Sequence, residues 1–254
     1  MSTVTSKDGT RIAFDRSGLG PAVILVVGAF NDRATGAPLA RFLERHFTVI
    51  NYDRRGKGES GDTAPYAIER EIEDLDALIA KTGNSACVFG YSSGAVLALR
   101  AAAHGLAISK LVLYEPPPTG SRAGQLTPQL TALLAAGRRG DAVELFQTDA
   151  VGIPAGVVAQ MRNAPFWPAL ETMAHTLVYE TIILKSLPAV LAASVRVPAL
   201  VIGGEESPKE MRHAAQLLAE TLPQGRYRTL EGQGHDIVPA AIGPALEEFL
   251  LAKG

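Results

Sequence analysis

The sequence predicts an α/β fold: a mostly parallel, doubly wound sheet with an antiparallel edge at its N-terminal end and a helical insertion. Short apolar runs rich in β-branched residues alternate with segments of helical spacing, which is typical of strands buried on both faces of a parallel sheet. A hairpin-like segment precedes these runs, and a long stretch without strand signals interrupts them. Strands that alternate with helices form βαβ units with right-handed crossovers.

The antiparallel edge is predicted from two short β-prone segments, 4–5 and 11–14, which are separated by Lys7-Asp8-Gly9-Thr10. An Asp-Gly pair between two such segments is typical of a β-hairpin turn. An antiparallel edge on an otherwise parallel sheet is common, so the hairpin is compatible with the strands that follow.

The strands of the parallel part are predicted from short apolar runs, followed by a last strand near the C-terminus; in chain order they are 22–27, 48–52, 86–90, 110–114, 199–203 and 226–230. Amphipathic spacing predicts helices that cover the sheet, at 37–46, 65–81, 95–100 and 237–251. The strand rhythm stops after residue 118, and the next segment is rich in Ala and Leu at helical spacing. We therefore expect a core formed by residues 1–118 and 198–254, with a helical cap inserted at 119–197.

The composition excludes several classes of protein. The chain has 254 residues, of which 47% are hydrophobic and 20% charged, as in an ordinary soluble globular protein. Lys and Arg number 24 against 26 Asp and Glu, a net charge of -2 that disfavours nucleic acid and anionic membranes as partners. We expect a small-molecule substrate, and a monomer or a homodimer.

Cellular location is predicted from two further features. Cys87 is the single cysteine, so no intramolecular disulfide can form, and the N-terminus has no apolar leader of the secretory type. The longest apolar stretch, 21–30, is shorter than the roughly 18–20 residues that a membrane span needs. These features favour the cytoplasm and no membrane partner.

The most informative motif is Gly90-Tyr91-Ser92-Ser93-Gly94, which lies between a predicted strand and a predicted helix. A serine on such a sharp turn exposes its hydroxyl above the sheet, and its flanking residues must be small because the backbone is crowded there. The pattern alone is also compatible with an ordinary Gly/Ser-rich turn. Its position between strand and helix favours Ser92 as a nucleophile.

A serine nucleophile needs a base, and His235 lies on a glycine-flanked loop between the last predicted strand and the last predicted helix. That loop is expected at the carboxyl edge of the sheet. The other four histidines are predicted to be solvated or ordinary structural residues; they are His46, His104, His175 and His213. Of these, His175 lies in the insertion, where a side chain can line a pocket.

With these motifs the chain resembles the α/β-hydrolase family over nearly its whole length. Besides the serine turn and the histidine, residues 53–60 (Asp-Arg-Arg-Gly-Lys-Gly-Glu-Ser) are similar to the Asp-x-Arg-Gly-x-Gly-x-Ser segment after the fourth strand of such enzymes. The resemblance implies an oxyanion hole formed by backbone N–H groups of Ser93 and, from the loop after the third strand, Ala29. Many members have His-Gly where this chain has Val27-Gly28, but a backbone donor is compatible with that change.

The catalytic acid departs from the family pattern. The resemblance places an aspartate in a Gly-x-x-Asp-Pro segment after the strand at 199–203, but this chain has Ser207 there. Glu115, at the end of the strand after the nucleophile helix, is the preferred substitute, because some family members draw their acid from that position. Glu206 is the alternative, and a site without a conventional acid is a third possibility.

The resemblance implies a serine hydrolase that cleaves an ester, thioester or lactone of a small, mostly apolar substrate through an acyl-enzyme. The alternatives are a carbon–carbon bond hydrolase, a cofactor-free non-hydrolytic enzyme, or a catalytically idle small-molecule receptor. Four residues are candidates for contact with the substrate: Phe30, Trp167, His175 and Tyr179. Trp167 and Tyr179 are equally compatible with the core of the cap, and for His175 a solvated or structural role is favoured. The sequence has no metal-ligand spacing and no dinucleotide motif, so neither a metal nor another cofactor is expected.

Overall fold

In the computed structural model, the described residues are 1–118, 120, 122–185 and 189–252. They fall into two compact units, one formed by Met1–Pro118 with Pro188–Gly254 and the other by Thr119–Leu187. Each unit has its own core, so each is described separately. No helix within the described residues is long and apolar enough to cross a membrane.

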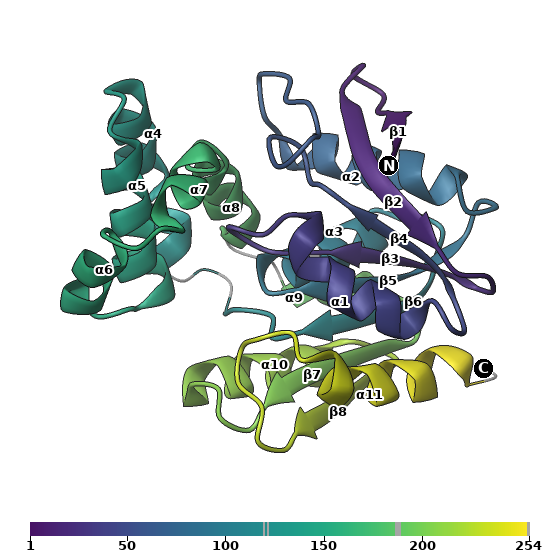
Figure 1. Cartoon of the computed structure of the whole chain (residues 1–254). Coiled ribbons are helices and arrows are strands. Elements are labelled where there is room, and N and C mark those ends of the chain that lie inside the picture. Colours follow the sequence, from purple (N-terminus) through teal and green to yellow (C-terminus); the bar gives the residue numbers. More distant parts are fainter. Residues whose placement is uncertain (119, 121, 186–188, 253–254) are drawn as a thin grey trace. The chain divides into compact units, whose positions relative to one another are not determined.

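The first unit contains an eight-stranded sheet (Figure 1). Its strands are β1 (Ser2–Thr5), β2 (Arg11–Ser17), β3 (Ala22–Val26), β4 (Thr48–Tyr52), β5 (Ala86–Tyr91), β6 (Ile108–Tyr114), β7 (Ala199–Gly204) and β8 (Gly225–Leu230). The spatial order is β1-β2-β4-β3-β5-β6-β7-β8; β1, β2 and β4 pair antiparallel, and every other pairing is parallel. The predicted fold class is confirmed.

The order of the strands reverses between β3 and β5. The chain passes from β3 to its neighbour β4, and then returns to add β5 on the other side of β3. In an open α/β sheet, such a reversal leaves a crevice at the carboxyl ends of the two central strands, where ligands bind. The loops that follow β3 and β5 therefore lie where a functional site is expected.

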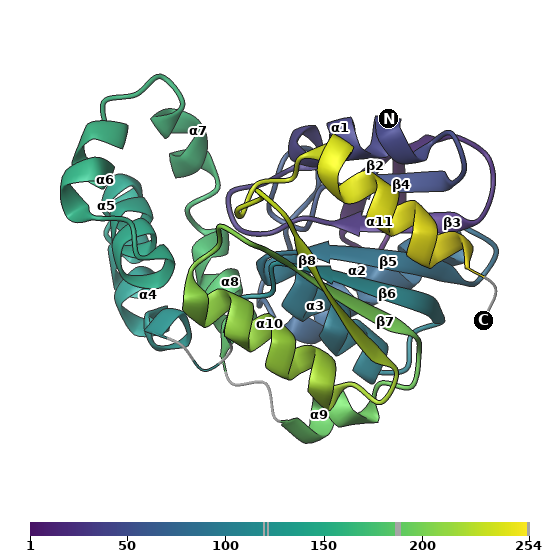
Figure 2. The same cartoon turned by 90° about the horizontal axis from the view of Figure 1, so that it is seen from below.

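Helices cover both faces of this sheet. The helices of the first unit are α1 (Arg33–Leu43), α2 (Ile68–Ala80), α3 (Ser93–Ala103), α9 (Ala189–Ser194), α10 (Lys209–Thr221) and α11 (Pro239–Leu251). Figures 1 and 2 show α1 and α11 together on one face, and α2, α3 and α10 on the other. β5 and β7 are buried along their whole length, because helices lie on both sides of them.

The helix α1 begins four residues earlier than the sequence predicted. Asp32 caps it, with a side-chain oxygen that accepts the Ala34 backbone N–H at 2.8 Å. Pro38 lies inside the helix, and the apolar spacing is clear only around and beyond that residue. The cap, rather than the hydrophobic pattern, therefore determines where this helix starts.

Two buried arginines stabilise the segment after β4. Arg54 makes a bidentate ion pair with Glu71 of α2, with both N–O distances at 2.7 Å. Arg55 pairs in the same way with Asp74 of α2 and also donates to Asp8 of the N-terminal hairpin. Both guanidinium groups are almost fully buried, so their charges are compensated inside the protein. These pairs connect the hairpin, the β4 loop and α2.

The second unit is helical (Figure 2). It consists of α4 (Thr127–Ala135), α5 (Arg139–Leu145), α6 (Ala155–Met161), α7 (Trp167–Thr172) and α8 (Thr176–Leu184), with a 3₁₀ turn at Arg122–Gln125 and a π-helical turn at Phe146–Val151. Its buried side chains include Leu130, Val143, Phe146, Val158, Trp167 and Leu177. The unit ends at 187, whereas the expected insertion ended at 197, because α9 packs with α3 and α10 of the first unit.

The hairpin contact of Asp8 predicts a pH-dependent contribution to stability. Burial by itself would raise the pKa of Asp8, but hydrogen bonds from Arg55 and Thr10 hold this pKa well below its ordinary value of 3.8. A carboxyl group with a lowered pKa stabilises the fold above its unfolded pKa, and this contribution declines as pH falls toward the folded pKa.

We therefore expect Asp8→Asn to lower the free energy of unfolding near neutral pH, and the difference from the wild type to shrink below about pH 4. Urea unfolding of both proteins at several pH values measures it. Glu248→Gln is the control, because Glu248 is exposed and pairs only with exposed Arg228 in the described contacts. A difference that stays constant with pH would contradict the assignment.

Candidate active site

Ser92 lies on the sharp turn between β5 and α3. Its backbone has φ 55° and ψ −128°, a conformation that costs free energy for any residue with a Cβ. The flanking glycines are required by space: a Cβ on Gly90 would lie 2.6 Å from the Ala95 Cα, and one on Gly94 would lie 2.3 Å from the Val26 carbonyl oxygen. The predicted turn geometry therefore follows from close backbone contacts with β3 and α3.

His235 contacts Ser92 directly. Its Nε2 lies 3.2 Å from the Ser92 Oγ, and its Nδ1 lies 3.1 Å from Oε2 of Glu115. The loop that carries the histidine is held from β6, because the Tyr114 hydroxyl lies 2.9 Å from the carbonyl oxygens of both Gly234 and Asp236. The structure thus brings together three residues that are widely separated in the sequence.

Glu115 is the carboxylate at this histidine. Its side chain is 1% exposed, and its backbone has φ 52°, so the residue is held in a strained, left-handed conformation at the end of β6. Oε1 accepts the Gly204 backbone N–H at 2.6 Å, and Oε2 accepts the Ser207 hydroxyl at 2.7 Å. These donors satisfy a buried carboxylate that would otherwise be costly.

The alternative acid, Glu206, does not reach His235. It is an exposed residue, and its backbone N–H donates to the Gln233 carbonyl oxygen at 2.8 Å. The acid contact of the histidine is therefore made by Glu115, the preferred residue, and not by Glu206.

Ser207 has a place in the site that the sequence did not predict. β6 and β7 are parallel neighbours, so the residues that follow them lie at the same edge of the sheet. The Ser207 hydroxyl, which occupies the place expected for an aspartate, donates to Glu115 instead. A hydroxyl at the aspartate position together with a glutamate after the adjacent strand is a signal that could have suggested this contact.

The loop after β3 lies against the serine. A Cβ on Gly28 would be 2.9 Å from the Ser92 Cβ, so only glycine permits this approach. Among the described residues, neither the Ala29 nor the Ser93 backbone N–H has a hydrogen-bond acceptor, and Ser93 is the first residue of α3. Two unpaired donors beside a serine can bind a negatively charged oxygen, and the positive end of the α3 dipole favours such charge.

Two buried cations donate to this same loop. The Arg54 Nη1 lies 3.3 Å from the Val27 carbonyl oxygen, and the Lys57 Nζ lies 2.8 Å from the Gly28 carbonyl oxygen. Lys57 is 2% exposed. The family-like sequence pattern at residues 53–60 contains both residues but predicts no role for either of them.

The residues expected to contact substrate lie in different environments. Phe30 is half-buried in the β3 loop, with φ 57°. Trp167 is 3% exposed inside the second unit, and its indole N–H donates to Glu171, as an ordinary core residue does. His175 and Tyr179 are half-buried in that unit, and their rings meet edge to face with centroids 6.2 Å apart. Their role, and that of the second unit, stays a prediction.

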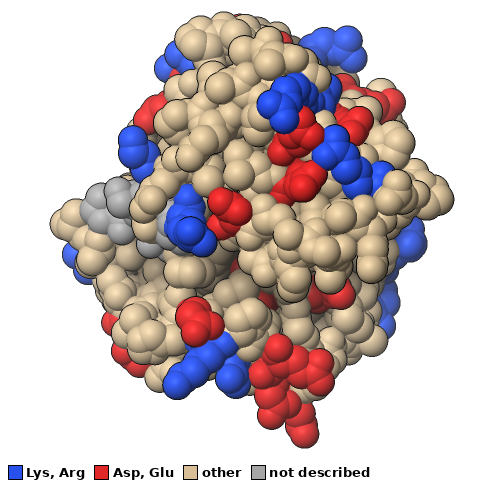
Figure 3. Space-filling model, turned by 90° about the vertical axis from the view of Figure 1, so that its left-hand side faces the viewer, with Lys and Arg blue, Asp and Glu red and all other residues tan. Residues whose placement is uncertain are grey.

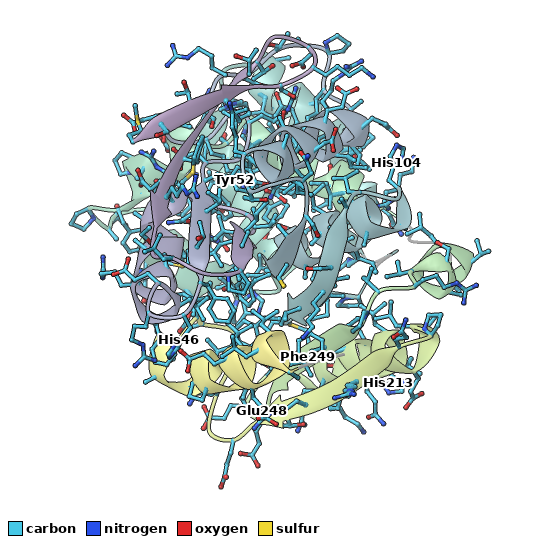
Figure 4. The ribbon with its side chains drawn as sticks, turned by 90° about the vertical axis from the view of Figure 1, so that its right-hand side faces the viewer. His46, Tyr52, His104, His213, Glu248 and Phe249 are labelled. Atoms are coloured by element: carbon cyan, nitrogen blue, oxygen red, sulfur yellow. The ribbon has the colours of Figure 1, made fainter. Side chains whose placement is uncertain are left out.

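The remaining candidates lie apart from Ser92. His46, His104 and His213 are exposed at separate places around the first unit (Figure 4). Cys87 is buried in β5, and burial raises the pKa of its thiol, which disfavours the reactive thiolate. The described residues contain no cluster of three His, Cys, Asp or Glu side chains that could hold a metal ion.

The surface charge is mixed. On the face drawn in Figure 3, basic and acidic side chains are interspersed, and no broad basic area forms among the described residues visible there.

A serine, a histidine and a buried carboxylate in contact at the carboxyl edge of a doubly wound sheet are the arrangement typical of α/β hydrolases. Comparison with known proteins agrees: the model of the alpha/beta hydrolase family matches residues 23–241. The chain belongs to the α/β hydrolase family, and it is an enzyme of that fold.

Individual relatives include an alpha/beta hydrolase from Sphaerobacter thermophilus, which is 54% identical with a TM-score of 0.90; the match covers 98% of this chain and 100% of that one. The enol-lactonase from Burkholderia xenovorans is 25% identical, with a TM-score of 0.72 over 99% of this chain and 100% of that one. N-formylmaleamate deformylase from Pseudomonas putida is 36% identical over 120 residues, 45% of each protein. The chain thus spans less than half the length of this curated relative.

The contact between Tyr114 and the His235 loop makes a testable prediction. Removing the hydroxyl in Tyr114→Phe leaves two carbonyl oxygens without their buried donor, so we expect the free energy of unfolding to fall by about 1–2 kcal/mol and the amides near His235 to exchange faster. Tyr91→Phe is the matched control, because the Tyr91 hydroxyl has no hydrogen bond within the described residues. Equal exchange rates in the two variants would contradict this role.

Proposed function

We propose that the protein is a serine hydrolase that cleaves an ester, thioester or lactone of a small, mostly apolar substrate through an acyl-enzyme. The observation that carries this proposal is the continuous contact from the Ser92 Oγ through the His235 ring to the Glu115 carboxylate, with distances of 3.2 and 3.1 Å. A nucleophile, a base and an orienting carboxylate in this order form the arrangement that activates a serine hydroxyl.

The first half of the reaction is acylation. The carboxylate of Glu115 favours a proton on the Nδ1 of His235, which leaves Nε2 free to accept a proton from Ser92. The Ser92 Oγ attacks the substrate carbonyl carbon, and the carbonyl oxygen becomes an oxyanion. As the tetrahedral intermediate collapses, the bond to the leaving group breaks, and the imidazolium returns its proton to that group.

The second half of the reaction is deacylation. Water gives a proton to the Nε2 of His235 and attacks the acyl carbon, and the bond to the Ser92 Oγ then breaks with return of the proton to the serine. In both halves the N–H groups of Ala29 and Ser93 bind the oxyanion, which is the site of greatest charge change. The strained backbone at Ser92 supports this assignment, because such a turn holds the serine hydroxyl exposed above the sheet.

The named relatives support acyl chemistry. One is named for an enol-lactone and the other for an N-formyl group, and each of these groups offers a carbonyl carbon to a nucleophile. Ser207 in place of the usual aspartate is the feature that favours a catalytically idle receptor. The contact of Glu115 with His235 removes that reason, because the histidine has a carboxylate from another strand.

The nucleophile is tested with a fluorophosphonate probe, which reacts with an activated serine. We expect the wild type to be labelled at Ser92, and Ser92→Ala to lose the label while it keeps the wild-type melting temperature. Ser93→Ala is the matched control: its backbone N–H is preserved, and its hydroxyl has no hydrogen bond among the described residues. Labelling that persists in Ser92→Ala, or a wild type that is never labelled, would refute a serine nucleophile.

The acid is tested by comparing two glutamine variants. Glu115→Gln is expected to slow hydrolysis of p-nitrophenyl acetate by a factor on the order of 10⁴, because a neutral amide cannot stabilise the imidazolium. Glu206→Gln is expected to retain the wild-type rate, since the Glu206 side chain is exposed and the backbone N–H that donates to the Gln233 carbonyl oxygen is kept. Steady-state kinetics of the two variants measure this difference. A large loss of rate in Glu206→Gln, with a wild-type rate in Glu115→Gln, would identify Glu206 as the catalytic acid instead.

A further inference from the structure

Lys57 is a buried cation next to the oxyanion donors. It lies in the loop after β4, is 2% exposed, and donates from Nζ to the Gly28 carbonyl oxygen at 2.8 Å. We propose that Lys57 is a positioning residue that strengthens the oxyanion hole by polarising the Gly28–Ala29 peptide. The inference rests on the proposed function, because it concerns the Ala29 N–H as an oxyanion donor.

Lys57 can act on the Ala29 N–H through the covalent structure of the loop. The Gly28 carbonyl and the Ala29 N–H belong to a single peptide unit, and in a trans peptide the two groups point in opposite directions. A cation at the carbonyl oxygen therefore lies on the side of the peptide opposite the N–H. It draws electron density toward the oxygen, which makes the N–H a stronger donor.

Burial makes this effect larger than it would be at the surface. Charge–dipole interactions are screened less in the protein interior than in water. Burying an ammonium group is costly, and an apolar side chain would fill the same space without that cost. Packing alone therefore does not account for a lysine at this position. A positive charge directed at the Gly28–Ala29 peptide would instead contribute to the proposed reaction.

The loop that carries Lys57 is held in place by the contacts of Asp53. The buried Asp53 carboxylate accepts the Arg33 and Glu59 backbone N–H groups at 2.8 and 2.9 Å, so it connects this loop to the start of α1. A Cβ on Gly58 would lie 2.3 Å from that carboxylate, and Gly58 has φ 52°. The glycine after Lys57 is therefore required for Asp53 to organise the loop.

Arg54, the other buried cation that donates to the loop after β3, contacts a different peptide from the one that Lys57 contacts. Arg54 donates to the preceding carbonyl, that of Val27, but its guanidinium is paired bidentately with Glu71. The Val27 carbonyl belongs to the peptide whose N–H is that of Gly28, not of Ala29. Of these two cations, Lys57 is therefore the one that acts on the proposed donor peptide.

Lys57 is expected to affect kcat more than KM, because the substrate oxygen becomes negatively charged only during the reaction. Negative charge develops on the substrate oxygen only as the Ser92 Oγ bonds to the carbonyl carbon and the carbonyl π bond breaks. An interaction that strengthens only then lowers the barrier and raises kcat, with little change in KM. A residue that merely shaped the pocket would change KM as well.

The test uses Lys57→Met and Lys57→Gln in the full chain, with p-nitrophenyl acetate as substrate and 2,2,2-trifluoroacetophenone as inhibitor. This ketone forms a reversible hemiketal with an active serine and places an oxyanion in the hole. Removing a whole oxyanion donor costs about 10²–10³ in rate; for Lys57→Met, which only weakens one donor, we expect a loss of about tenfold or more in kcat. KM should stay within about twofold, and hemiketal affinity should fall in parallel with kcat/KM.

Lys57→Gln keeps an uncharged donor, so its loss should be smaller than that of Lys57→Met. Lys110→Met is the matched control, because Lys110 also donates to backbone carbonyls, those of Phe249 and Leu250 at 3.0 Å. It lies on β6 five residues before Glu115, about 16 Å away along the strand. This variant should lose stability but keep kcat and hemiketal affinity.

The outcomes separate this inference from the proposed function. If folded Lys57→Met or Lys57→Gln is labelled at Ser92 and keeps wild-type kcat and hemiketal affinity, the role of Lys57 is refuted and the serine hydrolase assignment stands. A rise in KM with unchanged hemiketal affinity would refute it as well, since that pattern indicates shape alone. If the wild type itself is not labelled at Ser92, the proposed serine hydrolase function is refuted, and the role of Lys57 is refuted with it.

Discussion

The close approach of two backbone segments at the centre of the sheet is the constraint on which the site depends. The loop after β3 passes so near the turn after β5 that a side chain on Gly28 would overlap the Ser92 Cβ, and one on Gly94 would overlap the Val26 carbonyl oxygen. At this contact Ser92 has its strained conformation, with φ 55° and ψ −128°, and α3 begins at the next residue, Ser93. Glycine is required at both positions because backbone atoms of Val26 and Val27, and the Ser92 Cβ, already occupy the space that a further Cβ would need.

Strain is concentrated at the same edge of the sheet. Of the four non-glycine residues with positive φ in the described chain, three lie at the site, namely Phe30, Ser92 and Glu115. Each would be unfavourable in isolation, and each is compensated by contacts around it, such as the hydrogen bonds that Glu115 accepts from the Gly204 N–H and the Ser207 hydroxyl. The parallel sheet with its two helical layers supplies the rigidity that maintains these conformations.

Buried charge provides the second support of the site. Arg54 and Arg55 pair with carboxylates of α2, and Lys57 contacts the loop after β3. Together with Asp53 they explain why one short segment after β4 carries so many charged residues. The charged groups of Asp53, Arg54, Arg55 and Lys57 are buried, and their contacts connect this segment to the start of α1, α2, the hairpin and the loop after β3.

The sequence by itself determined the strands, the serine turn and the histidine loop, because hydrophobic periodicity and glycine requirements are local properties. It favoured Glu115 as the acid but left two alternatives open, namely Glu206 and a site without a conventional acid. Only the tertiary structure decided which carboxylate contacts His235, and that Ser207 donates to it, because these contacts depend on β6 and β7 being neighbours in the sheet. The end of the insertion and the inward direction of Lys57 were likewise decided by packing between segments distant in sequence, which no local pattern records.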